Sequence, residues 1–216
     1  MEEHGFAIVP EVLAPATVEA LIAEMANHPG HAMRHLVQSV PAVKEMADGS
    51  SVRGLVEPLL GSKAFVARSI FFDKTPQANW RVAWHQDLTI AVQAKIEVAG
   101  FTAWSVKAGA VHVQPPVSVL ERMLTVRLHL DDCAASNGAL QVIADSHTAG
   151  RLDASDIAQW RAEKRPTICA VSRGGALLMR PLLLHASLPA REPNHRRVVH
   201  LEFASEPLPG GLKWTL

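Results

Sequence analysis

The distribution of hydrophobic residues after residue 63 constrains the fold of this chain most. From Ala64 onward the apolar residues come in short runs that Gly, Pro, Asn and Asp interrupt, a pattern typical of β-strands. Many short strands after a helical start predict a mainly β jelly-roll sandwich with flanking helices. The predicted strands are Ala64–Lys74, Val82–Asp87, Met123–Asp131, Gly138–Ile143, Thr167–Val171, Gly175–Met179, Leu183–Leu188 and Arg196–Ala204.

The first 62 residues carry a helical pattern. A short strand is expected at Gly5–Pro10, and Pro15 is well placed as the first residue of a helix. Apolar residues then recur with the spacing of one buried helix face, at Val18, Leu21, Ile22 and Met25. A second helix is expected from Ser50 to Gly61. We expect this N-terminal part, residues 1–62, to pack on the outside of the jelly roll.

Length and charge narrow the class of protein. The 216 residues suit a single domain, 1–216, and 48% hydrophobic residues suffice for a buried core. The 21 Lys and Arg balance 21 Asp and Glu, which argues against nucleic acid or a membrane surface as the main partner. No apolar run is long enough to span a bilayer, and two cysteines provide no disulfide framework, so a cytoplasmic location is expected.

The segment Leu88–Arg122 has no clear hydrophobic period, and we interpret it as a lid or pocket wall inserted into the jelly roll. Its length and its glycines are typical of a loop that carries function. Substrate selection is expected from its apolar, polar and basic side chains, which are Phe101, Trp104, Lys107, His112 and Gln114.

Three pairs of alternate residues could contribute metal ligands. His85 and Asp87 lie two positions apart on a predicted strand, so their side chains share one face. With a histidine from elsewhere they would form a two-His-one-carboxylate triad, the donor set of non-haem Fe(II) oxygenases. His129 with Asp131, and His200 with Glu202, have the same spacing, and such pairs also arise by chance.

Two later features fit an iron centre with a dicarboxylate cosubstrate. His185 is the single imidazole in an otherwise apolar strand. Eleven residues later, Arg196 and Arg197 open another strand, and neighbouring strand residues face opposite sides, so at most one of them faces the metal. A buried arginine there would pair with a carboxylate, because its planar guanidinium binds one with two hydrogen bonds.

These residues resemble the phytanoyl-CoA dioxygenase family of Fe(II)- and 2-oxoglutarate-dependent oxygenases. The matching elements occur in order along nearly the whole chain: Gly5–Pro10, Phe72-Asp73-Lys74-Thr75-Pro76, Trp84-His85-Gln86-Asp87, Asn137–His147, His185-x-Ser187 and Arg196. Two departures stand out. Ala144-Asp145 replaces the usual Pro-Gly, and Gly174-Gly175 stands where Gly-Asp is common.

The resemblance implies a cupin-like double-stranded β-helix with Fe(II) held by His85, Asp87 and His185. It implies that Arg196 pairs with the distal carboxylate of 2-oxoglutarate and that Ser187 adds a hydrogen bond. In this alignment His129 and Asp131 are not metal ligands. Arg127 and Lys74 are candidate further contacts to cosubstrate or substrate, and they could equally be surface charges.

The implied activity is hydroxylation of a small organic substrate with O2, releasing succinate and CO2. Related halogenases have a small residue at the carboxylate position, so Asp87 favours hydroxylation over halogenation. Two alternatives stay open. The same cofactors support desaturation or epoxidation, and a jelly-roll binding or sensor protein could retain the fold without turnover.

Overall fold

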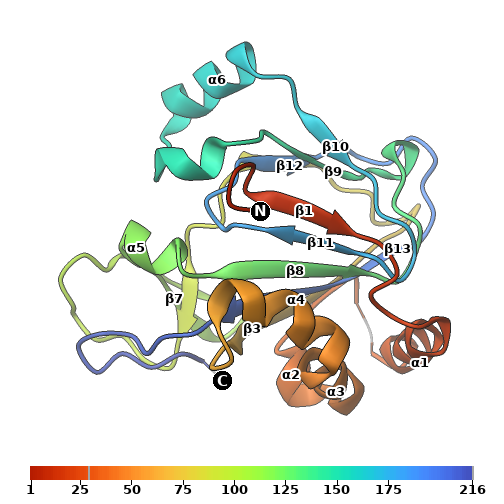
Figure 1. Ribbon diagram of the computed structural model, residues 1–216, viewed down its shortest axis with the longest axis horizontal. Helices are drawn as coiled ribbons and strands as arrows, with labels where there is room; N and C mark the ends of the chain where they lie inside the picture. Colours follow the sequence, from red (N-terminus) through yellow and green to blue (C-terminus); the bar gives the residue numbers. More distant parts are fainter. Residues whose placement is uncertain (29, 216) are drawn as a thin grey trace.

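Two antiparallel sheets face each other in the computed structural model, which describes residues 1–28 and 30–215 (Figure 1). The larger sheet has the order β1 (Phe6–Val9), β11 (Ala176–Met179), β8 (Leu124–His129), β13 (Arg196–Ala204), β3 (Phe65–Lys74) and β2 (Ala32–Arg34). The smaller sheet has the order β10 (Thr167–Cys169), β9 (Leu140–Val142), β12 (His185–Ser187) and β4 (Val82–His85). This arrangement confirms the mainly β jelly roll that the sequence predicts.

Strand β13 shows how the sequence separates the inside of the sandwich from its outside. Val199, Leu201 and Phe203 point away from the smaller sheet and join the core beneath the helices. The alternate residues, Arg196 and His200, line a cavity between the sheets. Because side chains alternate along a strand, one sequence supplies both an apolar outer face and a polar inner face.

The helices of the N-terminal part cover the outer face of the larger sheet (Figure 1). They are α1 (Pro15–Ala26), α2 (Leu36–Ser39), α3 (Pro41–Asp48) and α4 (Ser50–Leu60). The apolar face of α1, with Val18, Leu21 and Met25, packs into the same core as the outward side chains of β8 and β13. Helix α6 (Ala154–Glu163) lies beyond the smaller sheet, where Ile157 and Trp160 contact a separate apolar cluster.

Several predicted boundaries are corrected by the structure. Strand β2 and helices α2 and α3 were not predicted. The predicted strand Val82–Asp87 ends at His85, so Asp87 lies in the loop that follows β4. The predicted strand Met123–Asp131 ends at His129. Asp87 and Asp131 therefore lie beyond the ends of β4 and β8 and are not part of either strand.

The segment Leu88–Arg122 is not irregular, contrary to the sequence interpretation. It forms a third antiparallel sheet with the order β5 (Ile90–Val92), β7 (Ala110–Gln114) and β6 (Thr102–Lys107), followed by the short helix α5 (Val117–Leu120). Its buried residues pack against the C-terminal segment, including Leu212 and Trp214. Within the described residues, no helix combines the length and apolarity needed to cross a membrane.

Candidate metal centre

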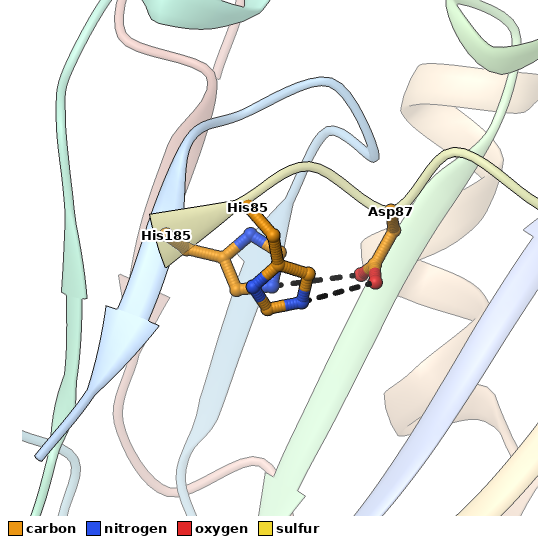
Figure 2. A group of neighbouring side chains, drawn as sticks. All are labelled: His85, Asp87 and His185. Carbon is orange, nitrogen blue, oxygen red and sulfur yellow. Dashed lines mark ion pairs between the residues drawn. The ribbon is translucent and has the colours of Figure 1, made fainter. Parts of the chain in front are cut away.

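Two histidines and an aspartate converge at the edge of the smaller sheet. His85 on β4 and His185 on β12 are directly opposite in the antiparallel register, and their ring centroids lie 4.2 Å apart. Asp87 follows β4, and its backbone N–H donates to the carbonyl of Pro181 at 2.9 Å. Its carboxylate oxygens lie 3.7 Å from the Nε2 atom of each histidine (Figure 2). The three residues therefore bring one donor atom each to a common point.

Backbone carbonyls fix the orientation of both imidazoles. The Nδ1 atom of His85 lies 2.8 Å from the Ala83 carbonyl, and that of His185 lies 2.8 Å from the Leu183 carbonyl. A carbonyl only accepts, so each Nδ1 carries the proton and each Nε2 lone pair is free. This is the arrangement that metal-ligating histidines usually show.

The charge states of these groups also suit a cation. Burial alone would raise the pKa of Asp87, but His185, His200, Arg68 and His85 around it lower this pKa to about 2. Desolvation lowers the pKa of His185 to about 4, although Asp87 opposes that shift. At neutral pH the site therefore presents a carboxylate and a neutral imidazole, the protonation states that bind a metal.

The donor set fits Fe(II) well. Two imidazole nitrogens and one carboxylate, with their donor atoms all within 4.8 Å of one another, match the facial triad that leaves three positions open. His185 is 5% exposed, whereas His85 is 40% exposed, so the site opens to solvent on the His85 side. The assignment of His85, Asp87 and His185 as metal ligands stays a prediction, and this geometry supports it.

The competing pairs behave differently. His129 points into the sandwich, whereas Asp131 pairs with Arg197, so these two do not converge. His200 and Glu202 do lie near Asp87, and the three form a second group whose donor atoms lie within 4.8 Å. This group is already hydrogen-bonded within itself and to arginines.

Two buried basic side chains lie next to each other, and one of them, Arg196, lines the cavity. Lys74 and Arg196 are directly opposite each other on β3 and β13, and they are 1% and 4% exposed. The Nζ atom of Lys74 donates to the Ser187 hydroxyl at 3.0 Å, and Arg196 donates to the Gly138 carbonyl. The Nε atom of Arg196 has no partner among the described residues.

The buried pair of Lys74 and Arg196 fits an anion. Burial, reinforced by the charge of Arg196, lowers the pKa of Lys74 to about 7. Of the described residues that line the cavity, Asp87 is the one acid, so the two cations have no carboxylate of their own. The cavity volume is about 110 Å³, the space of about four liquid waters at about 30 Å³ each.

Arg127 lines the same cavity as the two histidines, Asp87 and Arg196. It is 8% exposed, and its Nη1 atom donates to the Nδ1 atom of His200 at 2.8 Å. Desolvation and Arg196 lower its pKa to about 10, and its Nε atom has no partner in the described part of the chain. The sequence allowed Arg127 and Lys74 to be surface charges. The structure shows that both are buried.

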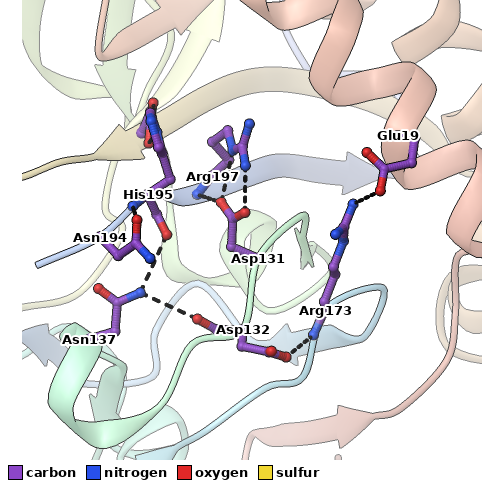
Figure 3. Close-up of polar contacts among 9 residues, drawn as sticks. Glu19, Asp131, Asp132, Asn137, Arg173, Asn194, His195 and Arg197 are labelled. Atoms are coloured by element: carbon purple, nitrogen blue, oxygen red, sulfur yellow. Dashed lines mark hydrogen bonds and ion pairs between the residues drawn. The ribbon is translucent and has the colours of Figure 1, made fainter. Parts of the chain in front are cut away.

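The neighbouring Arg197 faces the other side of β13. Its guanidinium binds the Asp131 carboxylate through two hydrogen bonds of 2.6 and 2.9 Å (Figure 3). It is not among the residues that line the cavity. Arg196 is therefore the arginine of the pair that reaches the cavity.

Arg68 and Glu202 belong to the site and were missed as a pair by sequence reasoning. They are opposite each other on β3 and β13, and on the same face the pair Ile70 and His200 comes next to them. The two side chains form a buried ion pair. The available signal was alternation, because residues 68, 70, 72 and 74 share a face with residues 196, 198, 200 and 202 once the two strands pair. That pairing cannot be read from either strand alone.

The residues expected to select substrate lie elsewhere. None of the described residues that line the cavity comes from the segment Leu88–Arg122. Phe101 is buried in a hydrophobic cluster, Trp104 packs against that cluster, and Lys107 is exposed at the end of β6. The lid role of this segment stays a prediction.

Comparison with solved structures shows the same fold at low sequence identity. The epimerase SnoN, solved with Fe3+, alpha ketoglutarate and nogalamycin RO, aligns with a TM-score of 0.72 at 15% identity, over 97% of this chain and 88% of that one. HygX from Streptomyces hygroscopicus, solved with nickel and 2-oxoglutarate, gives 0.68 at 14% identity, over 94% and 83%. AviO1 from Streptomyces viridochromogenes Tue57 gives 0.66 at 20% identity, over 96% and 94%.

The sequence itself decides the family. No curated protein matches the chain significantly. The family model of phytanoyl-CoA dioxygenase (PhyH) matches residues 1–198, a range that includes His85, Asp87, His185 and Arg196. The chain therefore belongs to the phytanoyl-CoA dioxygenase family of Fe(II)- and 2-oxoglutarate-dependent oxygenases.

Proposed function

We propose that this protein binds Fe(II) through His85, Asp87 and His185 and hydroxylates a small organic substrate, with release of succinate and CO2. The observation that carries the proposal is the pairing of two sites in one cavity. A facial triad with free donor atoms lies beside buried cations that lack a carboxylate. A cosubstrate that chelates iron at one end and carries an anion at the other would satisfy both.

Arg196, Lys74 and Ser187 would hold the distal carboxylate of 2-oxoglutarate. With the distal carboxylate held there, the keto acid end would face the triad, because Arg196 and Ser187 line the same cavity as His85, Asp87 and His185. Arg127, buried beside this path with an unpartnered Nε atom, would hold a carboxylate oxygen nearer the metal. Phe72 and Leu140 line the same cavity and would pack against the methylene groups of the ligand.

The chemistry divides between the cofactor and the protein. Bound iron with O2 and 2-oxoglutarate supplies the oxidising power, whereas the protein binds, orients and excludes water. The single carboxylate of Asp87 and two neutral imidazoles leave a centre with net charge +1, which favours binding of the dianionic cosubstrate. The carbonyls that hold each Nδ1–H fix the ring planes, so the free Nε2 atoms keep their direction throughout turnover.

Hydroxylation is the outcome we propose because Asp87 fills the carboxylate position. A small residue there would free a coordination position for halide. SnoN, with the same fold, is described as an epimerase, so related proteins use this architecture for other outcomes. The product of the reaction therefore has to be measured directly.

The test is an anaerobic titration with Fe(II) and 2-oxoglutarate, followed by turnover with O2. The expected result is a weak visible charge-transfer band when both are present and its absence when either is omitted. Succinate should then form with a metabolite extract, and the hydroxylated product should gain one oxygen atom by mass. A protein that binds neither Fe(II) nor 2-oxoglutarate would be a jelly-roll binding protein without turnover.

A further inference from the structure

A chain of four buried polar side chains crosses the inner face of the larger sheet beside the metal centre. Arg127 on β8 donates to His200 on β13 at 2.8 Å, and the Nε2 atom of His200 lies 3.1 Å from an oxygen of Glu202. The same oxygen, Oε1, accepts from Nε of Arg68 at 2.8 Å and also from its Nη2 atom. The side chains of Arg68 and Glu202 are 14% and 4% exposed.

The proton positions in this chain follow from the donors. A guanidinium has no lone pair to offer, so the Nδ1 atom of His200 must accept from Arg127. The proton of the neutral ring then sits on Nε2 and is donated to Glu202. Neither nitrogen of His200 has a lone pair left for a metal.

Glu202 is the one member of the chain that could still bind a metal. Its donor atom lies within 4.8 Å of the donor atoms of Asp87 and His200, and Asp87 belongs to the triad. Donor atoms on one octahedral metal with bonds of about 2.1 Å are about 3 Å apart. Glu202 lies near Asp87 but is not in the group formed by His85, Asp87 and His185, so its carboxylate would have to move to join a metal held by that triad.

We propose that Arg68 keeps Glu202 off the metal and so preserves an open coordination position. The inference rests on the proposed function, because it takes the metal to lie at His85, Asp87 and His185. An anionic carboxylate beside a divalent cation is attracted to it, and two guanidinium hydrogen bonds to Oε1 oppose that movement. Arg68 is on this view a positioning residue that acts through Glu202.

The experiment uses Co(II) alone as the metal probe, with the full chain and no substrate. Calorimetry gives the affinity, and the visible d–d absorption reports the coordination number. The variants are Arg68→Met, Glu202→Gln and the two combined. Arg197→Met is the matched control, because it breaks another partly buried arginine–carboxylate pair on β13 outside the cavity.

Arg68→Met should bind Co(II) on the order of tenfold more tightly, with weaker d–d absorption, because a further carboxylate joins the metal. The Co(II)-loaded variant should also bind 2-oxoglutarate on the order of tenfold more weakly, since one open position is filled. Adding Glu202→Gln should reverse both changes. Glu202→Gln alone and Arg197→Met should leave Co(II) affinity unchanged.

Two results would overturn the inference. Weaker Co(II) binding in Glu202→Gln alone would show that Glu202 already coordinates the metal, which contradicts the proposal. Equal Co(II) behaviour in Arg68→Met and Arg197→Met also contradicts it. In the Glu202→Gln background there is no carboxylate at position 202 for Arg68 to hold. Adding Arg68→Met to that background must therefore leave Co(II) affinity unchanged.

The two proposals fail in different ways. Wild-type protein that binds Co(II) and loses it in His185→Ala confirms the triad, and the Arg68 variants then decide the inference alone. Wild-type protein that binds no Co(II) contradicts the proposed function, and the inference falls with it.

Discussion

His185 differs from the other buried histidines in having its Nε2 lone pair free and aimed at a carboxylate. We predict that His185→Ala removes most metal binding, because a facial triad has no spare ligand. His129→Ala should leave metal binding largely intact, since His129 is not part of either group of converging donors. Calorimetric titration with Fe(II) or Co(II) measures both. Loss of binding in His129→Ala with retention in His185→Ala would show that the ligand pair was chosen wrongly.

Arg196 and Arg197 are neighbours in sequence with opposite surroundings. Removing one charged partner of an enclosed pair typically costs about 2–5 kcal/mol, so Arg196→Met should raise the 2-oxoglutarate dissociation constant at least about tenfold. Arg197→Met should leave that constant near the wild-type value, because its partner is Asp131. Fluorescence or calorimetric titration with 2-oxoglutarate separates the two, and reversed phenotypes would contradict the observed register of β13.

Lys74 should make the unliganded protein depend on pH in an unusual direction. Its pKa is about 7 in the folded protein and 10.5 ordinarily, because of burial and the nearby Arg196. Between these values the unfolded chain binds more protons than the folded one, so stability rises with pH. Below pH 7 the lysine is charged in both states and this contribution is constant.

The expected result is that ligand-free wild type gains stability from about pH 7 to about pH 10 relative to Lys74→Met. Denaturant unfolding at several pH values measures the difference. Over the same range 2-oxoglutarate should bind more weakly to the wild type, as the lysine loses its charge. A stability difference between the two proteins that is independent of pH would contradict the lowered pKa.

The residues of the metal centre could be predicted from sequence better than their surroundings. Spacing alone left His129 with Asp131 and His200 with Glu202 open, and the order of motifs that resembles the phytanoyl-CoA dioxygenase family singled out His85, Asp87 and His185 as the candidate ligands. Arg68 and Glu202 were not singled out as a pair, because each is one of many charges until β3 and β13 pair. The register between two strands distant in sequence is what brings them together.

At the scale of elements, the β6–β7 hairpin explains why the segment Leu88–Arg122 looked irregular. A bulge between Thr102 and Ser105 shifts its alternation, so the period of two is broken inside β6. Its turn is the pair Ala108-Gly109, both with positive φ, and Ala-Gly is a weak hairpin signal beside Asn-Gly. Helices α2 and α3 escaped prediction for a related reason, since four and eight residues hold too few turns to show a period.

Trp104 on this hairpin is expected to matter for stability. It is half-buried and packs against the cluster that contains Phe101 and Trp214. We predict that Trp104→Ala lowers the free energy of unfolding by roughly 1–3 kcal/mol, below the cost of a fully buried tryptophan. Its affinities for metal and 2-oxoglutarate should not change. Denaturant unfolding and ligand titration check both.

Lys107 tests the lid expectation separately, because it is exposed at the tip of the hairpin. If the hairpin covers the site during turnover, Lys107→Ala should change substrate turnover while leaving the unfolding free energy and 2-oxoglutarate affinity near wild type. Turnover equal to wild type would contradict a lid role for this part of the segment.

At the scale of the whole molecule, the space between the two sheets contains apolar side chains in one region and charged side chains in another. The apolar region holds residues of β9, β10 and β11, including Val142 and Leu177. The cavity with His85, Asp87, His185 and Arg196 in its lining lies between the two sheets as well. The sequence predicted the sandwich architecture because short apolar runs broken by turn residues follow a helical start. It did not predict this division, which depends on which inner faces meet.

The like charges of Lys74 and Arg196, opposite each other on β3 and β13, have a consequence outside catalysis. They repel each other in the folded chain and separate when it unfolds, so an anion that binds between them acts as a folding partner. Binding to the native state alone shifts the folding equilibrium by mass action. Since cellular proteases remove unfolded chains, the amount of this protein in a cell would follow the supply of its dicarboxylate. The metabolite that the enzyme consumes would in this way also set how long the enzyme survives.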